Sequence, residues 1–153
     1  MATMSPTSTT QWQRYLARLD EQPHRKATEE DLTRARQRLG TDLPESLANL
    51  LRETDGWPHP GVLHGLCSTT ELRWTSDPTH DLVDAWTSFE EIVEVIAGCL
   101  VVVDGGDGRY CLLDASRTGD DGEWIAYDWG AGDGEDPVPY PSLSALVDDL
   151  TTR

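Results

Sequence analysis

The sequence predicts an α+β fold in which helices pack on one side of a mainly antiparallel sheet. Three observations indicate this fold class. Residues 28–56 carry the signals of two short helices joined by a turn. Residues 99–114 contain an apolar run and a second strand pattern, separated by an Asp/Gly turn. Residues 142–150 close the chain with an amphipathic helix pattern.

The length of 153 residues fits one domain that can bury its own core, and we assign residues 9–153 to it. Residues 1–8 are mostly small and polar, so we expect a disordered lead-in without a secretion signal. No apolar run is long enough to span a bilayer. We therefore expect a cytoplasmic protein that does not enter membranes.

The first helix is expected from about residue 11 to residue 20. Thr10 and Gln13 have the spacing of a capping box, in which each side chain accepts from the other residue's backbone N–H. Apolar side chains recur at helical spacing at Trp12, Tyr15, Leu16 and Leu19. This stripe predicts that the helix packs on the rest of the domain.

The next two helices form the pair on which the fold prediction depends. Thr28 is a candidate N-cap, and Asp31 lies three residues later, where its carboxylate can accept from free N–H groups. Gly40 suits the left-handed conformation that ends many helices. Pro44 fits the first turn of the second helix, which Asp55-Gly56 ends. The two apolar stripes expected to pack together are Leu32, Ala35 and Leu39, then Leu47, Leu50 and Leu51.

The middle of the chain gives weaker signals. Trp57 precedes two prolines, and we expect it to plug the core beside the helix end, with a surface contact as the alternative. A strand is predicted over residues 70–75, and Asp77-Pro78 indicates the start of a helix. Residues 88–98 fit a helix or a strand, and we favour a helix followed by an extended piece.

The sheet has clearer signals. Residues 99–103 are an unbroken apolar run, which predicts a central strand buried on both faces. Residues 104–108 supply the glycines of a hairpin turn to an antiparallel strand over residues 109–114. The remaining predicted elements are a polar connection over 115–122, a strand over 123–129, a loop over 130–141 and a final helix capped by Ser142.

The order of these motifs is distinctive. An acidic helix start is followed by Leu39-Gly40, then Leu43-Pro44-Glu45, a leucine-rich helix and Gly56-Trp57. This segment resembles the opening signature of the SUKH superfamily, the Smi/Knr-type domain. The later strands and the closing Ser-Leu helix follow the order of the same family, so the resemblance covers about residues 12–150.

The resemblance implies a binding module with the fold predicted above. Many bacterial members of the superfamily are immunity proteins that neutralise a polymorphic toxin, often a nuclease or a deaminase. Others are intracellular regulators or scaffolds. The matching motifs are helix caps and packing positions, so they specify a fold better than an activity. No catalytic residue is known for the family as a whole, so the resemblance implies none.

Acidic residues are concentrated in the later part of the chain. Up to residue 53 there are eight acidic and eight basic residues, whereas from residue 54 onward there are twenty acidic and four basic ones. The later part therefore carries the whole net charge of −16. Such a segment repels nucleic acid and anionic membranes and attracts a basic partner. Solubility alone is the alternative explanation of the same charge.

Groups of potential metal ligands and nucleophiles lack the required spacing. The acidic turns lack the alternating ligands and terminal Glu of a calcium loop. No fourth zinc ligand accompanies His59, His64 and Cys67, and no hydrolase signature surrounds Cys67 or Cys111. The turn over 105–108 has no P-loop lysine. We expect no catalytic residue, metal or cofactor, and we expect the three cysteines to be reduced, buried thiols.

The predicted partner-binding residues are acidic and aromatic. Tryptophan is a frequent anchor of protein interfaces, and carboxylates around it can pair with Arg or Lys of a partner. The candidates lie in three loops and on the strand over 123–129. They are Asp104, Asp107, Asp120, Asp121, Glu123, Trp124, Asp128, Trp129, Asp133, Glu135 and Asp136.

These observations predict a non-enzymatic protein-binding domain. The favoured function is that of an immunity protein that covers the active site of a basic, nucleic-acid-directed toxin. The alternatives are a regulatory or scaffold domain with a housekeeping partner and a small enzyme. An immunity protein predicts charge concentrated on one face, a scaffold predicts an apolar patch, and an enzyme predicts a pocket with converging polar groups.

Overall fold

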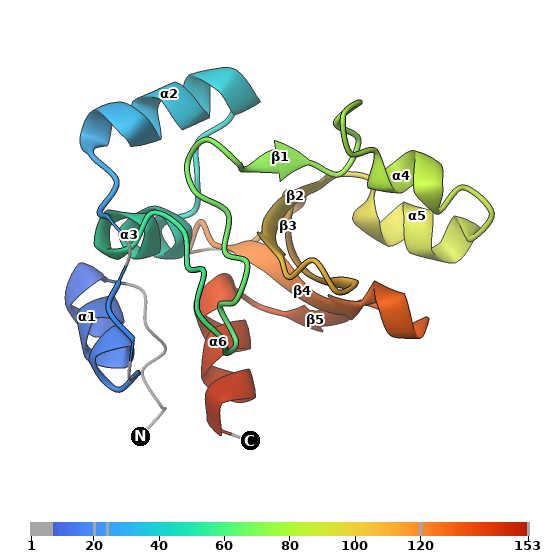
Figure 1. The fold of residues 1–153 in the computed structure, drawn as a ribbon. Coiled ribbons are helices and arrows are strands. Elements are labelled where there is room, and N and C mark those ends of the chain that lie inside the picture. The colour runs from blue at the N-terminus through green and yellow to red at the C-terminus, as the bar shows by residue number, and fades with distance from the viewer. Residues whose placement is uncertain (1–7, 20, 24, 120, 153) are drawn as a thin grey trace.

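The computed structural model describes residues 8–19, 21–23, 25–119 and 121–152. It confirms an α+β fold built on one five-stranded antiparallel sheet (Figure 1). The helices are α1 (Thr9–Ala17), α2 (Glu29–Leu39), α3 (Glu45–Glu53), α4 (Leu82–Ala85), α5 (Glu90–Ile96) and α6 (Leu143–Thr152), with a 3-10 turn η1 (Ala131–Asp133). The strands are β1 (Arg73–Trp74), β2 (Cys99–Asp104), β3 (Arg109–Thr118), β4 (Trp124–Gly130) and β5 (Val138–Tyr140).

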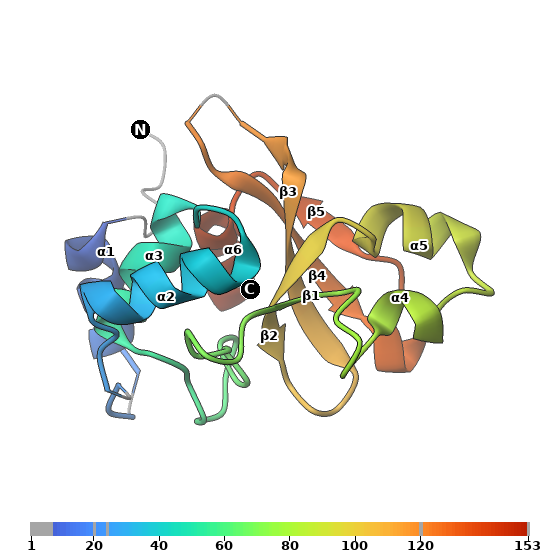
Figure 2. The same cartoon turned by 90° about the horizontal axis from the view of Figure 1, so that it is seen from above.

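The strands lie in the sheet in the order in which they occur in the chain, β1-β2-β3-β4-β5. As predicted, the helices α1, α2, α3 and α6 lie on one side of the sheet (Figure 2). The short helices α4 and α5 lie on the other side (Figure 2). Both faces of the sheet are therefore covered along part of their length.

The helix α1 begins earlier than the sequence pattern predicted. Ser8, rather than Thr10, is the N-cap, and its Oγ accepts from the Gln11 backbone N–H at 3.2 Å. The Gln11 side chain in turn accepts from the Ser8 N–H at 3.0 Å, which completes the capping box two residues earlier than predicted. The helix ends at Ala17. Of the predicted disordered lead-in, residues 1–7 lie outside the described residues.

The predicted helix pair is confirmed. Thr28 and Asp31 form a reciprocal capping box on α2, and Gly40 ends that helix in the left-handed region with φ of 74°. Pro44 occupies the N-cap position of α3 rather than its first turn. The apolar residues of both stripes are buried. Trp57, which follows α3 in the chain, is also buried, as predicted for a core residue.

Three predictions for the later chain were incomplete. The helix α4 starts after Asp81, because Asp77 instead accepts from Thr79 N–H in a local turn. The strand predicted over residues 70–75 is limited to β1 (Arg73–Trp74), whereas the helix favoured for residues 88–98 is confirmed as α5 (Glu90–Ile96). The strand β3 continues to Thr118 through an irregular register, so the predicted polar connection over 115–122 is partly strand.

The predicted loop over residues 130–141 also contains structure that the sequence did not indicate. It includes η1 and the edge strand β5, whose sequence is Val-Pro-Tyr. A proline cannot donate to a strand ladder, and for this reason strands with proline are found at sheet edges. The final helix α6 agrees with the prediction, since the Ser142 Oγ accepts from Ala145 N–H at 3.0 Å.

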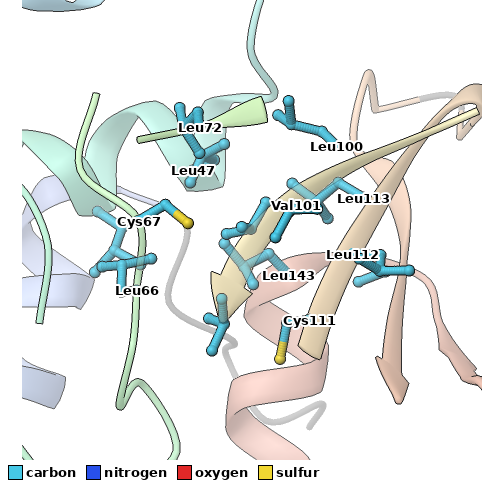
Figure 3. Packing of buried hydrophobic residues seen from close by; sticks show 14 of the residues in the cluster. Leu47, Leu66, Cys67, Leu72, Leu100, Val101, Cys111, Leu112, Leu113 and Leu143 are labelled. Atoms are coloured by element: carbon cyan, nitrogen blue, oxygen red, sulfur yellow. The ribbon is translucent and has the colours of Figure 1, made fainter. Parts of the chain in front are cut away.

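The main core lies between the sheet and the four longer helices. Leu66 and Cys67 reach it from the loop before β1, Leu47 from α3 and Leu143 from α6 (Figure 3). All three cysteines are buried free thiols, as expected. Burial raises the pKa of Cys67, Cys99 and Cys111 to about 12 in each case. These thiols therefore stay protonated at neutral pH.

Candidate protein-binding surface

The turn between β2 and β3 holds the first two candidate residues. Asp104 is partly buried, and its carboxylate accepts from Arg73 Nη2 at 2.7 Å and from Gly106 N–H at 3.0 Å. Asp107 is exposed and accepts from Arg109 N–H at 3.2 Å. Of the two, Asp107 therefore presents the more accessible negative charge.

The loop after β4 lies directly against this turn. Gly132 N–H donates to Gly108 O at 3.0 Å. A Cβ atom on Gly108 would lie 2.6 Å from Gly132 Cα, so the two backbones can approach in this way only without a side chain at residue 108. This contact brings Asp107 and the exposed carboxylates of Asp133 and Glu135 around one shallow cavity.

The remaining acidic loop lies elsewhere. The turn between β3 and β4 follows Thr118, at the opposite end of the two strands from the turn at residues 104–108 (Figure 2). Asp121 is exposed there, and its Oδ1 accepts from Glu123 N–H at 2.9 Å. Asp120 lies outside the described residues. The candidate acidic residues therefore do not form a single surface.

Glu123 has a structural position rather than a surface one. It is only 5% exposed, and its carboxylate accepts from the Ser46 N–H at 3.1 Å and from the Ser46 hydroxyl. Ser46 lies in the first turn of α3, where backbone N–H groups have no partner within the helix. Glu123 thus caps α3 from the start of β4, and the prediction that it faces a partner is corrected.

Both candidate tryptophans are also internal. Trp124 is 7% exposed, and Trp129 is fully buried with its indole N–H donating to Glu135 O at 2.9 Å. The two side chains point to opposite faces of β4. For either tryptophan to anchor a partner, its face of the strand would have to be exposed to solvent. The α6 helix packs on β4 from one side, and Trp86 from the end of α4 contacts Trp129 from the other. Neither tryptophan is therefore available as a surface anchor.

Asp128, the last candidate on β4, is partly buried. Its Oδ1 lies 3.2 Å from Nε of Arg109, whose Nη1 also donates to Val62 O at 2.9 Å. This internal ion pair compensates the charge of Asp128. Asp128 therefore contributes less to the surface charge than the exposed loop carboxylates do.

Phe89 and Trp86 form an aromatic surface that the sequence pattern did not predict. Four rings make a continuous row from the sheet outward, with centroid distances of 5.7 Å for Tyr110–Trp129, 5.0 Å for Trp129–Trp86 and 5.0 Å for Trp86–Phe89. Phe89 ends the row and is 56% exposed, the most exposed large hydrophobic residue of the described chain. The only sequence signal was an isolated phenylalanine directly before Glu90-Glu91.

A groove runs beside Phe89, between α5 and the loop after β4. Its lining residues are Trp86, Ser88, Phe89, Glu90, Glu91, Ile92, Gly134 and Asp136. The loop that follows β4 lines both this groove and the shallow cavity that contains Asp107, Asp133 and Glu135, so the two hollows are neighbours. We define the acidic surface as the six exposed carboxylates of Glu90, Glu91, Asp107, Asp133, Glu135 and Asp136.

Basic residues are scarce around this surface. The sequence has no Lys or Arg over residues 74–108 or over residues 118–152, which include all six carboxylates. Arg109 lines the cavity but is paired with Asp128. Among the described residues that line the groove and the cavity, Arg109 is the one basic side chain, so little positive charge compensates the acidic surface.

Other kinds of site find little support in the described parts of the chain. No group of three His, Cys, Asp or Glu residues is arranged to hold a metal ion there. A second groove is lined by Trp57, Cys67, Arg73 and Asp104, among others, but burial raises the pKa of the Cys67 thiol to about 12. Cys67 is therefore a poor nucleophile at neutral pH. The described helices include none that is long and apolar enough to cross a membrane.

Two comparisons with known proteins bear on the family of this chain. A comparison with curated proteins gives no match. Residues 26–149 match the family model described as SMI1 / KNR4 family (SUKH-1), which spans most of the 153-residue chain. The matched range begins just before α2 and ends within α6. The chain therefore belongs to the SMI1/KNR4 family (SUKH-1).

Proposed function

We propose that this chain is a non-enzymatic immunity protein that neutralises a basic, nucleic-acid-directed toxin by direct binding in the cytoplasm. Membership of the SUKH-1 family is compatible with this role. The observation that carries the proposal is the acidic surface, where six exposed carboxylates from three separate segments lie together with little compensating charge.

The mechanism follows from charge. A protein that acts on nucleic acid must present a basic surface to phosphate groups. The acidic surface is attracted to that same basic surface, so the immunity protein occupies the place of the substrate. Attraction between opposite charges also speeds the encounter, which matters when a toxin must be captured before it acts.

Growth rescue tests the proposal directly. The chain is co-expressed with each toxin domain encoded beside its gene, and growth is compared with that of cells expressing the toxin domain alone. We expect one basic toxin domain to be neutralised. We also expect the chain to co-purify with a catalytically inactive form of that domain, and the complex to dissociate as salt is raised, because salt screens surface charge.

Replacement of surface carboxylates tests the mechanism. The variant Asp133→Asn, Glu135→Gln should associate with the toxin about tenfold more slowly at low salt, because steering depends on the charge of the face that meets the partner. Asp42→Asn with Glu45→Gln removes exposed charge near α3, on the other side of the sheet, and is the control. Capture of a housekeeping complex that survives high salt, with no rescue from any neighbouring toxin, would favour a scaffold role instead.

A further inference from the structure

We propose that the groove beside Phe89 binds an arginine side chain of the partner, stacked on the Phe89 ring and paired with the carboxylates that line the groove. This inference rests on the proposed function, because it specifies which partner group the acidic surface recognises. It concerns Phe89, Glu90, Glu91 and Asp136 in particular.

The Phe89 ring is held in place before any partner arrives. Its centroid lies 5.0 Å from that of Trp86, which in turn contacts the buried Trp129. A fixed ring loses little conformational freedom on binding, and this reduces the cost of forming an interface. More than half of the side chain is nevertheless open to solvent, so the ring has a free surface to offer.

The surrounding carboxylates are available for pairing. Within the described ranges, no hydrogen bond or ion pair joins the side chain of Glu90, Glu91 or Asp136 to another residue. Glu90 and Glu91 lie in the first turn of α5, where the helix dipole favours negative charge, so they are stable there without a cationic neighbour. An incoming cation therefore has no existing ion pair to displace.

The combination of an aromatic face and nearby carboxylates favours arginine over lysine. The guanidinium group is planar, so it can stack on an aromatic ring while its N–H groups donate to carboxylates at its edge. Paired N–H···O bonds to a carboxylate add both energy and orientation. The lysine ammonium is compact and strongly hydrated, so it gains less from the same groove.

The test uses two synthetic nonapeptides of alternating sequence, one of Arg and Gly and the other of Lys and Gly, titrated into the 15N-labelled full chain at low salt. We expect the Arg peptide to bind about fivefold more tightly than the Lys peptide, from the stacking contribution. We expect its largest amide shifts in residues 86–92 and 134–136. Phe89→Ala should remove this preference, and Phe89→Leu should do the same because it keeps apolar bulk but has no aromatic face.

Charge controls separate recognition from general attraction. Glu90→Gln with Glu91→Gln should weaken binding of the Arg peptide, whereas Asp42→Asn with Glu45→Gln, which removes the same charge on the other side of the sheet, should not. Circular dichroism confirms that each variant is folded. Equal affinity for both peptides, or shifts centred on residues 107 and 121 that persist in Phe89→Ala, would overturn the inference.

The outcome is distinguishable from that of the proposed function. If toxin neutralisation occurs but Phe89→Ala leaves toxin affinity unchanged, the immunity role stands and the arginine groove is rejected as its site. If the Arg peptide binds at the groove and depends on Phe89, but no neighbouring toxin is neutralised, the groove stands and the immunity role is rejected.

Discussion

Glu123 joins two parts of the molecule that are far apart in the sequence. Its carboxylate accepts from Ser46 in α3, 77 residues earlier. The Ser46 carbonyl accepts from the Trp12 indole N–H of α1 at 2.9 Å, so this one serine connects α1, α3 and β4. Charged groups that are buried in this way are stable only when their hydrogen bonds are made.

Glu123→Ala should therefore destabilise the fold. Loss of the carboxylate leaves the Ser46 N–H and hydroxyl buried without their acceptor, and we expect a loss of about 2–3 kcal/mol in the free energy of unfolding. Glu123→Gln should cost less, because its amide oxygen can still accept one bond. Urea unfolding measures both changes.

The control for Glu123 is Asp133→Asn, a change at an exposed acidic residue of the acidic surface. It should change the free energy of unfolding by less than about 0.5 kcal/mol. A Glu123→Ala variant as stable as Asp133→Asn would show that the buried contact with Ser46 contributes nothing.

These two residues show where the sequence could not predict the candidate site. Glu123 and Asp133 both lie in acidic turns with glycine, so local sequence assigns both to the surface. Only the packing of α3 against the start of β4, which depends on residues far away in the chain, separates them. The exposure of Phe89 was unpredictable for the same reason, because any apolar residue beside a helix start is a candidate for the core.

At the scale of elements, one glycine allows the loop before β1 to pair with the end of β2. Gly65 N–H donates to Trp57 O, and Gly65 O accepts from Asp104 N–H, both at 3.0 Å. Its φ is 85°, and a Cβ atom at this position would lie 2.1 Å from Asp104 O. A side chain at residue 65 is thus excluded both by backbone conformation and by space.

Gly65→Ala and Gly40→Ala form a matched pair. Both glycines have positive φ, but no atom lies within 4 Å of a Cβ built on Gly40. We expect Gly40→Ala to cost about 1–2 kcal/mol, from the backbone conformation alone. Gly65→Ala should cost at least about 3 kcal/mol, because the backbone at Asp104 must also move.

Thermal unfolding of the two variants in parallel checks this difference. Equal losses of stability would mean that the close approach of Gly65 to Asp104 O carries no cost. The sequence predicted the role of Gly40 but not that of Gly65. Gly40 acts in a local motif at the end of its own helix, where its N–H donates to Arg36 O, whereas the constraint on Gly65 comes from a strand that follows much later.

The same distinction explains how much of the fold was predictable. The helix pair, the hairpin after β2 and the capped helix α6 depend on signals within a few residues of each other, and all three are confirmed. The strand β5 is only three residues long and contains Pro139, so its local sequence resembles a loop. It is a strand because β4 offers an edge beside it.

At the scale of the whole molecule, the buried thiols make stability depend on pH. Burial raises the pKa of Cys67, Cys99 and Cys111 to about 12, whereas a thiol in the unfolded chain has a pKa of about 8.5. The unfolded chain therefore loses protons that the folded chain keeps. This contribution to stability is complete below about pH 8.5 and is lost as the pH rises toward 12.

We expect the free energy of unfolding to fall between pH 8 and pH 11, as measured by urea titration at each pH. Burial also raises the pKa of Tyr15, Tyr110 and Tyr127, which acts in the same direction. The free energy of unfolding of the variant Cys111→Ala should decrease less between pH 8 and pH 11 than that of the unchanged chain, because one titrating thiol is absent.

A thiol reagent should label no cysteine of the folded chain at pH 8 and all three in urea. Rapid labelling of the folded chain would show that at least one of the three thiols is not buried.

The contact between Gly108 and Gly132 has a consequence for how this protein can evolve. It fixes the spacing of two loops through backbone atoms alone, so the exposed acidic side chains at positions 133, 135 and 136 can change without disturbing this contact. Relatives that diverge with their partners should therefore differ most at positions 133, 135 and 136 while retaining the glycine at 108. Such an arrangement lets selection alter specificity by single substitutions, without a cost in foldability.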